Sequence, residues 1–267
     1  MESTLKKNYN KIFICAAIQL LMLSCTDKLS YEKELIGNSS NIVLVVSENW
    51  NDSLAQVYLL SRSDMGYKKA SESMNGIIGK KGLGIGIGEH TDASFQQFKN
   101  VDENIPIKKE GDKKSPAGIF KIGKIMGFAD SLPFSSDLEY KKITQGLHAV
   151  DDSDSEYYNQ IVNANLLKPL FHDYYNSYED MFHLQHAYDW LFEIKHNSER
   201  IPEKGSNIFF HIRNVNGSGT AGCTAVNRDD LLQILKFIDK QTLVIQLPEE
   251  IYQKVHKELN LPLINEL

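Results

Sequence analysis

Cysteine is scarce in this sequence, and its placement excludes a disulfide-stabilised fold. Only three cysteines occur in 267 residues, and two of them, Cys15 and Cys25, lie near the N-terminus. Cys223 therefore has no second cysteine in the rest of the chain to pair with. Oxidising compartments attack unpaired thiols, so in an exported protein its retention favours a chemical role. A buried, inert thiol is the alternative.

Long apolar runs and an excess of positive charge are also missing. The formal net charge is -6, which argues against a general nucleic-acid binder, because neutralising phosphates needs clustered Lys and Arg. Beyond the N-terminal 25 residues, no apolar stretch is long enough to cross a bilayer. With 42% hydrophobic and 24% charged residues, the chain has enough apolar material for a globular core.

The N-terminus has the pattern of an export signal. Three lysines precede an apolar stretch, 12–23, that is too short to span a membrane and that leads through Ser24 into Cys25. This pattern resembles a bacterial lipoprotein signal peptide over residues 1–24, cut before Cys25 and leaving lipid on that residue. An ordinary secretory signal with an incidental cysteine is the alternative. Residues 25–40 are polar and predict a tether between the anchor and the folded domain.

Beyond residue 40 the chain is dominated by strand patterns. Apolar and alternating runs predict strands over 41–47, 54–61, 188–195, 206–213 and 242–247. Helix signals are fewer, and they predict a helix over 228–240 capped by Asn227, a short helix after Pro248, and a helix-like segment over 157–167. The sequence therefore predicts one mainly β domain over 41–267 with a few helices, of a sandwich or barrel type.

Three other segments suggest ligand sites that their details do not favour. Glycines at 82, 84, 86 and 88 recur with a period of two, which predicts one strand face open to another backbone or a ligand, not a nucleotide-binding turn. The acidic run 151–156 lacks the glycine and distal glutamate of an EF-hand loop, which favours a solvated turn over a calcium site. His172, His183 and His186 lack the spacing of a zinc motif, so no metal is predicted.

The segment 208–230 joins the parts of a nucleophilic site. An apolar strand carries His211, a glycine-rich turn follows, and Cys223 stands 12 residues later, shortly before a helix. A free thiol is only a few per cent ionised at neutral pH, so an imidazole that takes its proton would activate it. The pair predicts a cysteine nucleophile with a histidine base.

Four blocks around this pair resemble the L,D-transpeptidase catalytic domain family (YkuD-like), in the branch whose motif is Thr-Ala-Gly-Cys-Thr-Ala. The motif occupies 220–225, and the other blocks are 109–120, 150–162 and 209–212. The resemblance implies a mainly β sandwich of two mixed sheets, with the cysteine at the mouth of a cleft. It also implies peptidoglycan stem peptides as substrate and no metal or organic cofactor.

The resemblance assigns a role to each matching residue. Cys223 would be the nucleophile, His211 the base, and the backbone N–H groups of Gly222 and Cys223 the oxyanion hole. The thiolate would form a thioester, and an amine of a second stem peptide would resolve it into an L,D cross-link.

Contacts with the substrate are expected from residues around the motif and the second block. The wider family usually has His before Gly-Cys and Arg or Asn two residues after the cysteine, and this chain has Ala221 and Ala225 at those positions. Polar contacts with substrate must therefore come from other residues, and arginine is a good candidate because it pairs well with carboxylates. The candidates are Arg213, Thr220, Arg228, Tyr158 and Asn159. Surface charge for the two arginines, and helix packing for Tyr158 and Asn159, are the alternatives.

Two other functions stay open on the sequence. An L,D-carboxypeptidase or amidase would use the same thioester and resolve it with water. A catalytically silent envelope lipoprotein that binds peptidoglycan would have no need for both Cys223 and His211. In each case we expect a protein of the cell envelope or periplasm, held at a membrane by lipid on Cys25, with peptidoglycan and not nucleic acid as its partner.

Overall fold

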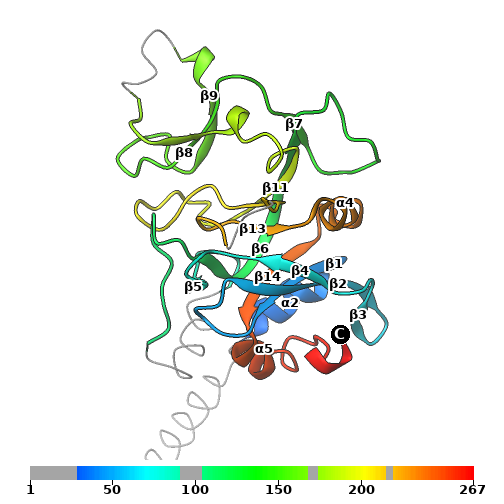
Figure 1. Cartoon of the computed structure of the whole chain (residues 1–267). Helices are drawn as coiled ribbons and strands as arrows, with labels where there is room; N and C mark the ends of the chain where they lie inside the picture. Colours follow the sequence, from blue (N-terminus) through cyan, green and yellow to red (C-terminus); the bar gives the residue numbers. More distant parts are fainter. Residues whose placement is uncertain (1–28, 91–103, 168–173, 215–218) are drawn as a thin grey trace, which may run out of the picture.

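The fold is built mainly from strands (Figure 1). The computed structural model describes residues 29–90, 104–167, 174–214 and 219–267. The strands are β1 (Asn41–Ser47), β2 (Leu54–Ser63), β3 (Gly66–Lys69), β4 (Met74–Ile77), β5 (Leu83–Ile85), β6 (Ser115–Gly127), β7 (Tyr140–Lys142), β8 (Leu147–Val150), β9 (Gln160–Asn163), β10 (Tyr178–Asp180), β11 (Trp190–Ile194), β12 (Phe209–Ile212), β13 (Thr224–Val226) and β14 (Leu243–Pro248). The helices are α2 (Ser30–Asn38), α4 (Arg228–Phe237) and α5 (Glu249–Val255), with single 3-10 turns at η1 (Ala164–Leu166), η3 (Met181–His183) and η4 (Ile264–Glu266).

Eight of the strands close into a barrel. Their order is β1, β14, β6, β11, β12, β13, β4 and β2, and β2 pairs back onto β1. The mainly β class with a few helices is confirmed, but the predicted sandwich of two mixed sheets is wrong. Alternating apolar residues specify a half-buried strand in either architecture. The sheet closes because β1 pairs with β14 on one side and with β2 on the other. Local sequence patterns cannot predict the pairing of β1 with β14, since the two strands are far apart in the chain.

A small antiparallel sheet, in the order β10, β8, β9, lies beside the barrel (Figure 1). A hydrophobic cluster joins the two, with Leu147 and Ala149 of β8 buried alongside Leu191 and Phe209 of the barrel. The helix-like segment predicted over 157–167 is wrong, since β9 and η1 occupy most of it. The left-handed backbone of Asn159, with φ 55°, stops a helix there, and the residues that follow pair with β8.

Helix α2 corrects the prediction of a tether over 25–40. Leu29 and Ile36 are each 1% exposed, and the Tyr67 hydroxyl donates to the Ile36 carbonyl at 2.6 Å. Residues 29–38 are therefore packed against the fold. The predicted signal peptide and Cys25 lie outside the described residues, so those two predictions stay untested.

The other predicted elements are found close to their expected positions. All five predicted strand segments contain a strand, and the helix after Asn227 begins with the Asp230 N–H donating to the Asn227 side chain at 2.9 Å. The glycine-rich run is divided between β4, a turn and β5. Only Gly84 lies in β5, and Gly82, with φ 79°, comes just before it, so the prediction that the four alternating glycines of this run share one strand face is wrong. Its glycines do admit another backbone, because a Cβ at Gly84 would lie 3.0 Å from the Lys108 nitrogen.

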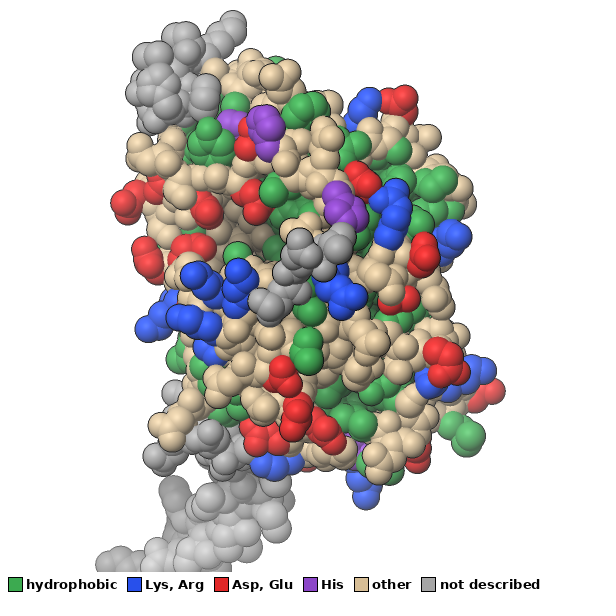
Figure 2. Space-filling model, in the orientation of Figure 1, with side chains coloured by type: hydrophobic (Ala, Val, Ile, Leu, Met, Phe, Trp, Pro, Cys, Tyr) green, Lys and Arg blue, Asp and Glu red, His purple; other side chains and the backbone are tan. Residues whose placement is uncertain are grey.

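Basic side chains form one group on the face drawn in Figure 2. Several Lys and Arg side chains lie together at mid-height on the left, with acidic side chains above and below them, while on the right the two signs are mixed. Within the described ranges, no helix is long and apolar enough to span a bilayer. The same ranges contain no group of His, Cys, Asp and Glu side chains placed to hold a metal ion, and His172 lies outside them.

Candidate active site

The fold brings His211 and Cys223 onto the same side of two neighbouring strands. β12 and β13 pair in parallel with His211 opposite Ala225, and Cys223 stands two residues before that alanine. Side chains two residues apart on a strand share a face, so the imidazole and the thiol are on one side of the barrel wall. This side faces the hydrophobic cluster beneath the small sheet, against which Cys223 packs.

The Cys223 sulfur is enclosed by polar groups as well as apolar ones. The Phe209 N–H donates to it at 3.3 Å, the thiol points toward the Asn207 carbonyl at 3.8 Å, and the Tyr188 hydroxyl contacts it. Burial, followed by the negative charge of Glu179, raises the pKa of Cys223 to about 12. The resting residue is therefore a neutral thiol at physiological pH.

His211 is buried but makes no hydrogen bond with Cys223 in the described part of the chain. Its Nδ1 donates to the Ile212 carbonyl at 2.8 Å, which leaves Nε2 as the basic nitrogen of a neutral ring. Burial lowers the pKa of His211 to about 4. The ring of Tyr188 packs edge-on against the imidazole, with centroids 5.4 Å apart, so Tyr188 contacts both residues of the predicted pair.

The turn that carries Cys223 is held by two hydroxyl groups. Thr220 Oγ1 accepts from the Gly222 N–H at 3.1 Å and donates to the Cys223 carbonyl at 2.6 Å. Ser115 donates to the same carbonyl at 2.9 Å and accepts from the Gly79 N–H at 2.9 Å. The Gly222 N–H is therefore engaged within the turn, whereas the Cys223 N–H has no hydrogen-bond partner among the described residues.

The next residue anchors the turn to the far side of the barrel. The Thr224 hydroxyl donates to the Gln246 side-chain oxygen, and the Gln246 side-chain nitrogen donates to the Pro116 carbonyl at 2.9 Å. All three polar groups are buried. One glutamine thus links β13, β14 and β6 directly behind the candidate nucleophile.

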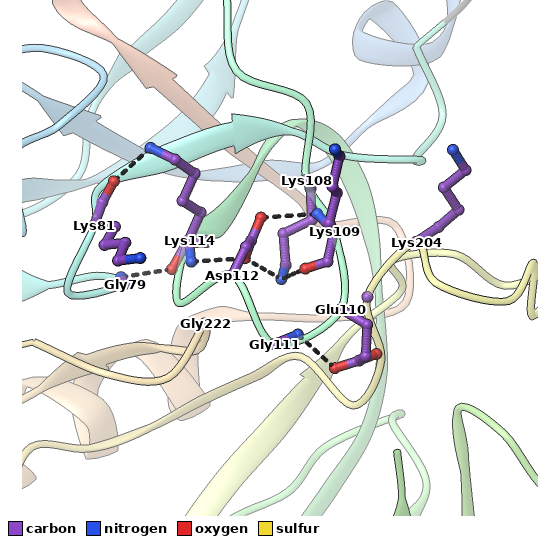
Figure 3. Close-up of polar contacts among 12 residues, drawn as sticks. Gly79, Lys81, Lys108, Lys109, Glu110, Gly111, Asp112, Lys114, Lys204 and Gly222 are labelled. Atoms are coloured by element: carbon purple, nitrogen blue, oxygen red, sulfur yellow. Dashed lines mark hydrogen bonds and ion pairs between the residues drawn. The ribbon is translucent and has the colours of Figure 1, made fainter. Parts of the chain in front are cut away.

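A cavity of about 160 Å³ opens beside Cys223. Its wall includes Lys108, Asp151, Glu179, Ser206 and Asn207. Figure 3 shows Lys108 held within its own loop, where its ammonium bonds Asp112 at 2.7 Å and the Lys109 carbonyl at 2.6 Å. The same ammonium would lie 3.9 Å from a Cβ placed on Gly222, so it is close to the turn that carries the thiol.

None of the five residues predicted to contact substrate is part of the wall of this cavity. Tyr158 is 2% exposed, and its hydroxyl donates to the cavity residue Glu110 at 2.6 Å, which makes it a support. The side-chain amide of Asn159 donates to the Asn197 carbonyl and accepts from the Asn207 N–H, so both of its ends are engaged within the fold. Three others are also absent from the cavity wall: Thr220, which is bonded within its turn, Arg228, which pairs with Asp189 at 2.5 Å, and Arg213.

Sequence reasoning missed four residues around the thiol: Lys108, Glu179, Tyr188 and Ser206. Lys108 directly precedes the block at 109–120 that resembles the family, and this position could have marked it as a candidate site residue. Glu179 reaches the cavity because β10 pairs with β8, placing it opposite Ala149. The sequence near Cys223 does not predict that β10 pairs with β8.

A second, larger cavity of about 440 Å³ adjoins the first. The two share Asn207 and Ile208 as a common wall. Four basic side chains line the larger one, together with a single carboxylate, that of Glu193. These basic residues are Lys124, Lys141, Lys195 and Arg200. An extended ligand crossing both cavities would therefore meet acidic and basic surroundings on either side of the shared wall.

Comparison with known families decides the affiliation of the chain. The model of YkuD, the L,D-transpeptidase catalytic domain, matches residues 75–245, from β4 to β14, and so includes both His211 and Cys223. The chain belongs to this family. The resemblance inferred from the four sequence blocks is thereby confirmed at the level of the family.

Solved structures similar to this YkuD-family chain are distant from it. Bd1075 of Bdellovibrio bacteriovorus is 14% identical, with a TM-score of 0.38, and the match covers 78% of this chain and 48% of that one. Pgp2 of Campylobacter jejuni, a helical cell shape determining protein, is 17% identical, with a TM-score of 0.35 over 82% of this chain and 54% of that one. The chain thus spans about half the length of these structures. A search of curated proteins found no match.

Proposed function

We propose that this protein is an exported L,D-transpeptidase that cross-links peptidoglycan stem peptides through a thioester on Cys223. Membership of the L,D-transpeptidase catalytic domain family supports the reaction type. The observation that carries the proposal is local. In the part of the chain that the structure describes, Cys223 is the one thiol, it lies beside a cavity with its backbone N–H unbonded, and a neutral imidazole is on the same strand face.

In the first half of the proposed reaction, the Cys223 sulfur attacks the peptide carbonyl while its proton passes to Nε2 of His211. The Cys223 N–H stabilises the developing oxyanion. The carbon–nitrogen bond breaks, the leaving amine takes the proton from the imidazolium, and a thioester remains. In the resting structure Tyr188 contacts both residues, and His211 and Cys223 make no hydrogen bond with each other among the described residues. Substrate binding therefore has to bring the sulfur within hydrogen-bond distance of the imidazole.

In the second half, the amine of another stem peptide, after losing its ammonium proton to solvent, attacks the thioester. It gives up a further proton to His211, and the new amide forms as the Cys223 sulfur leaves and takes that proton back from the imidazolium. In the resting structure the raised pKa of Cys223 and the lowered pKa of His211 both oppose transfer of the thiol proton to the imidazole. The proposal therefore requires bound substrate to change the surroundings of this pair.

The test is acylation of the purified full-length protein, followed by intact mass. A carbapenem, which in this family can mimic the acyl donor, and a tetrapeptide-containing muropeptide are each expected to add a mass that maps to Cys223. Cys223→Ser should remove the adduct, and His211→Gln should slow its formation. Failure of the wild-type protein to form any adduct that depends on Cys223 would overturn the proposal.

The products then separate transfer from hydrolysis. Cross-linked muropeptides are expected when a second stem peptide is supplied. Trimmed tripeptides alone would assign the protein to the carboxypeptidases instead. The proposed location in the cell envelope, with a lipid anchor on Cys25, is tested by Cys25→Ala, which should release the protein from the membrane fraction. Unchanged membrane association would contradict the anchor.

A further inference from the structure

Three carboxylates line the cavity beside Cys223. Glu110 accepts from the Tyr158 hydroxyl and the Gly111 N–H, whereas Asp151 and Glu179 have fewer partners among the described residues. Glu179 uses one oxygen to accept from the Tyr188 hydroxyl. Asp151 has a buried side-chain oxygen, Oδ1, with no hydrogen-bond partner in the described ranges. Burial and the negative charge of Asp151 both raise the pKa of Glu179, so the two carboxylates are close enough to repel each other.

The lysine on the same cavity wall does not neutralise them. Lys108 is 3% exposed, and its ammonium is already bonded to Asp112 at 2.7 Å and to the Lys109 carbonyl at 2.6 Å. In the described part of the chain, neither Asp151 nor Glu179 forms an ion pair with Lys, Arg or His. Buried carboxylate oxygens ordinarily have a charged or hydrogen-bonding partner. Among the described residues Asp151 Oδ1 has none and Glu179 has only the Tyr188 hydroxyl, which leaves room for a cation that arrives from solution.

A hydroxyl group on the same wall gives a second, independent indication of a ligand. Ser206 is 9% exposed, and its Oγ is buried with no hydrogen-bond partner among the residues described. Buried hydroxyl groups nearly always have a partner, so an unpaired one on a residue of the cavity wall, beside two carboxylates, indicates a polar group that binds there. A ligand with several donors and a positive charge satisfies all three side chains.

We propose that Asp151, Glu179 and Ser206 form a subsite for a primary ammonium group of the substrate, next to the thiol of Cys223. An ammonium has three N–H donors and no acceptor, which matches two carboxylate oxygens and one hydroxyl. A cavity of about 160 Å³ accommodates the end of a side chain and not a whole peptide. The inference rests on the proposed function and names the substrate chemistry that the site selects.

Two amines take part in the proposed reaction, and both have this chemistry. One is the side-chain amine of the diamino-acid residue whose carbonyl Cys223 attacks. The other is the amine of the acceptor stem peptide. The experiment therefore needs one arm for each source.

The donor arm uses the full-length protein and two tetrapeptide donors, one with a free diamino-acid side chain and one with that amine acetylated. Thioester formation is followed by intact mass across donor concentrations. If the subsite binds the donor, acetylation should raise the half-saturating concentration at least about tenfold in the wild type, the scale of a charge-assisted hydrogen bond. Asp151→Asn should bind the free donor as weakly as the acetylated one.

The acceptor arm starts from the preformed thioester and adds a tripeptide with a free diamino-acid side chain. If the subsite binds the acceptor, Asp151→Asn should lower the ratio of cross-linked to hydrolysed product at least about tenfold without changing the donor's half-saturating concentration. Ser206→Ala should shift the same ratio in the same direction. This second variant removes only an unpaired hydroxyl, so it keeps the test available if Asp151→Asn fails to fold.

Asp154→Asn is the matched control, because it removes the same charge from an exposed position in the same loop. The subsite is refuted if both cavity variants match this control in both arms while thioester formation proceeds normally. That result would leave the proposed function standing. If the wild type forms no thioester with any donor, the proposed function fails, and the subsite with it.

Discussion

The backbone N–H of Phe209 points at the sulfur of Cys223 from 3.3 Å. Such a donor favours the thiolate and by itself would lower the pKa of the thiol. Burial and the charge of Glu179 outweigh it, and the pKa of Cys223 is raised to about 12. The same N–H keeps the sulfur in one position, so the residue is oriented for attack while it stays protonated.

The first prediction concerns thiol reactivity with pH. Alkylation of Cys223 by iodoacetamide should rise about tenfold per pH unit from pH 7 to pH 10, because the reactive thiolate is the minor form throughout this range. Peptide mapping by mass spectrometry separates Cys223 from Cys15 and Cys25. A rate that levels off near pH 6 or 7 would instead indicate a standing thiolate–imidazolium pair.

The second prediction concerns Glu179. Glu179→Gln removes a negative charge that raises the pKa of Cys223, so alkylation at pH 8 should become several-fold faster. Glu156→Gln, at an exposed position, is the control and should leave the rate unchanged. A slower rate in Glu179→Gln would mean that its bond with Tyr188 matters more to the thiol than its charge.

The third prediction concerns stability in acid. Burial lowers the pKa of His196 and of His211 to about 4, against about 6.5 in an unfolded chain. Both rings are then neutral in the folded protein and charged in the unfolded chain between these values. Each contributes stability that is present above pH 6.5 and is lost as the pH falls toward 4, roughly 3 kcal/mol per ring.

Urea unfolding at pH 7 and pH 4.5 measures this effect. His196→Gln should lower stability at pH 7, since the ring accepts from the Ile87 N–H and donates to the Lys204 carbonyl, but should lose less on acidification than the wild type. An equal loss in the variant would show that His196 is not responsible for the acid sensitivity.

How far the sequence predicts this molecule differs between its parts. The strand at 41–47, the Asn227 cap and the helix after it follow from local patterns, and the structure has them. The barrel does not follow, because its closure depends on pairing between residues some 200 positions apart. The helix expected over 157–167 fails because pairing of Ile161 and Val162 with β8 overrides local preference.

The candidate site shows the same division. Cys223 and His211 could be chosen from residue type and a short separation along the chain. Glu179 and Lys108 come to the cavity from segments remote in sequence. No local pattern marks Glu179, and only the adjoining block at 109–120 points to Lys108. Thr220 could be chosen from the motif, but only the structure assigns its hydroxyl to the turn.

The fourth prediction concerns the glutamine behind the turn. Gln246→Leu should destabilise the protein by about 2 to 4 kcal/mol, because it leaves the buried Thr224 hydroxyl and the Pro116 carbonyl without partners. Adding Thr224→Val should restore part of this loss, since a methyl group then replaces the unpaired hydroxyl. Denaturant unfolding of the two single variants and the double variant measures the coupling. Additive losses would show that the two side chains act independently.

Closure of the barrel by β14 also sets an order of events during synthesis. β1 is among the first folded segments to be made, yet its parallel neighbour, Leu243–Pro248, is among the last. Gln246, which fixes the position of Thr224 behind the thiol, arrives with that final strand. A nascent chain that already contains Cys223 has the Thr220 and Ser115 hydroxyls of its turn, but it lacks the Gln246 contact with Thr224 until the C-terminal strand joins the sheet.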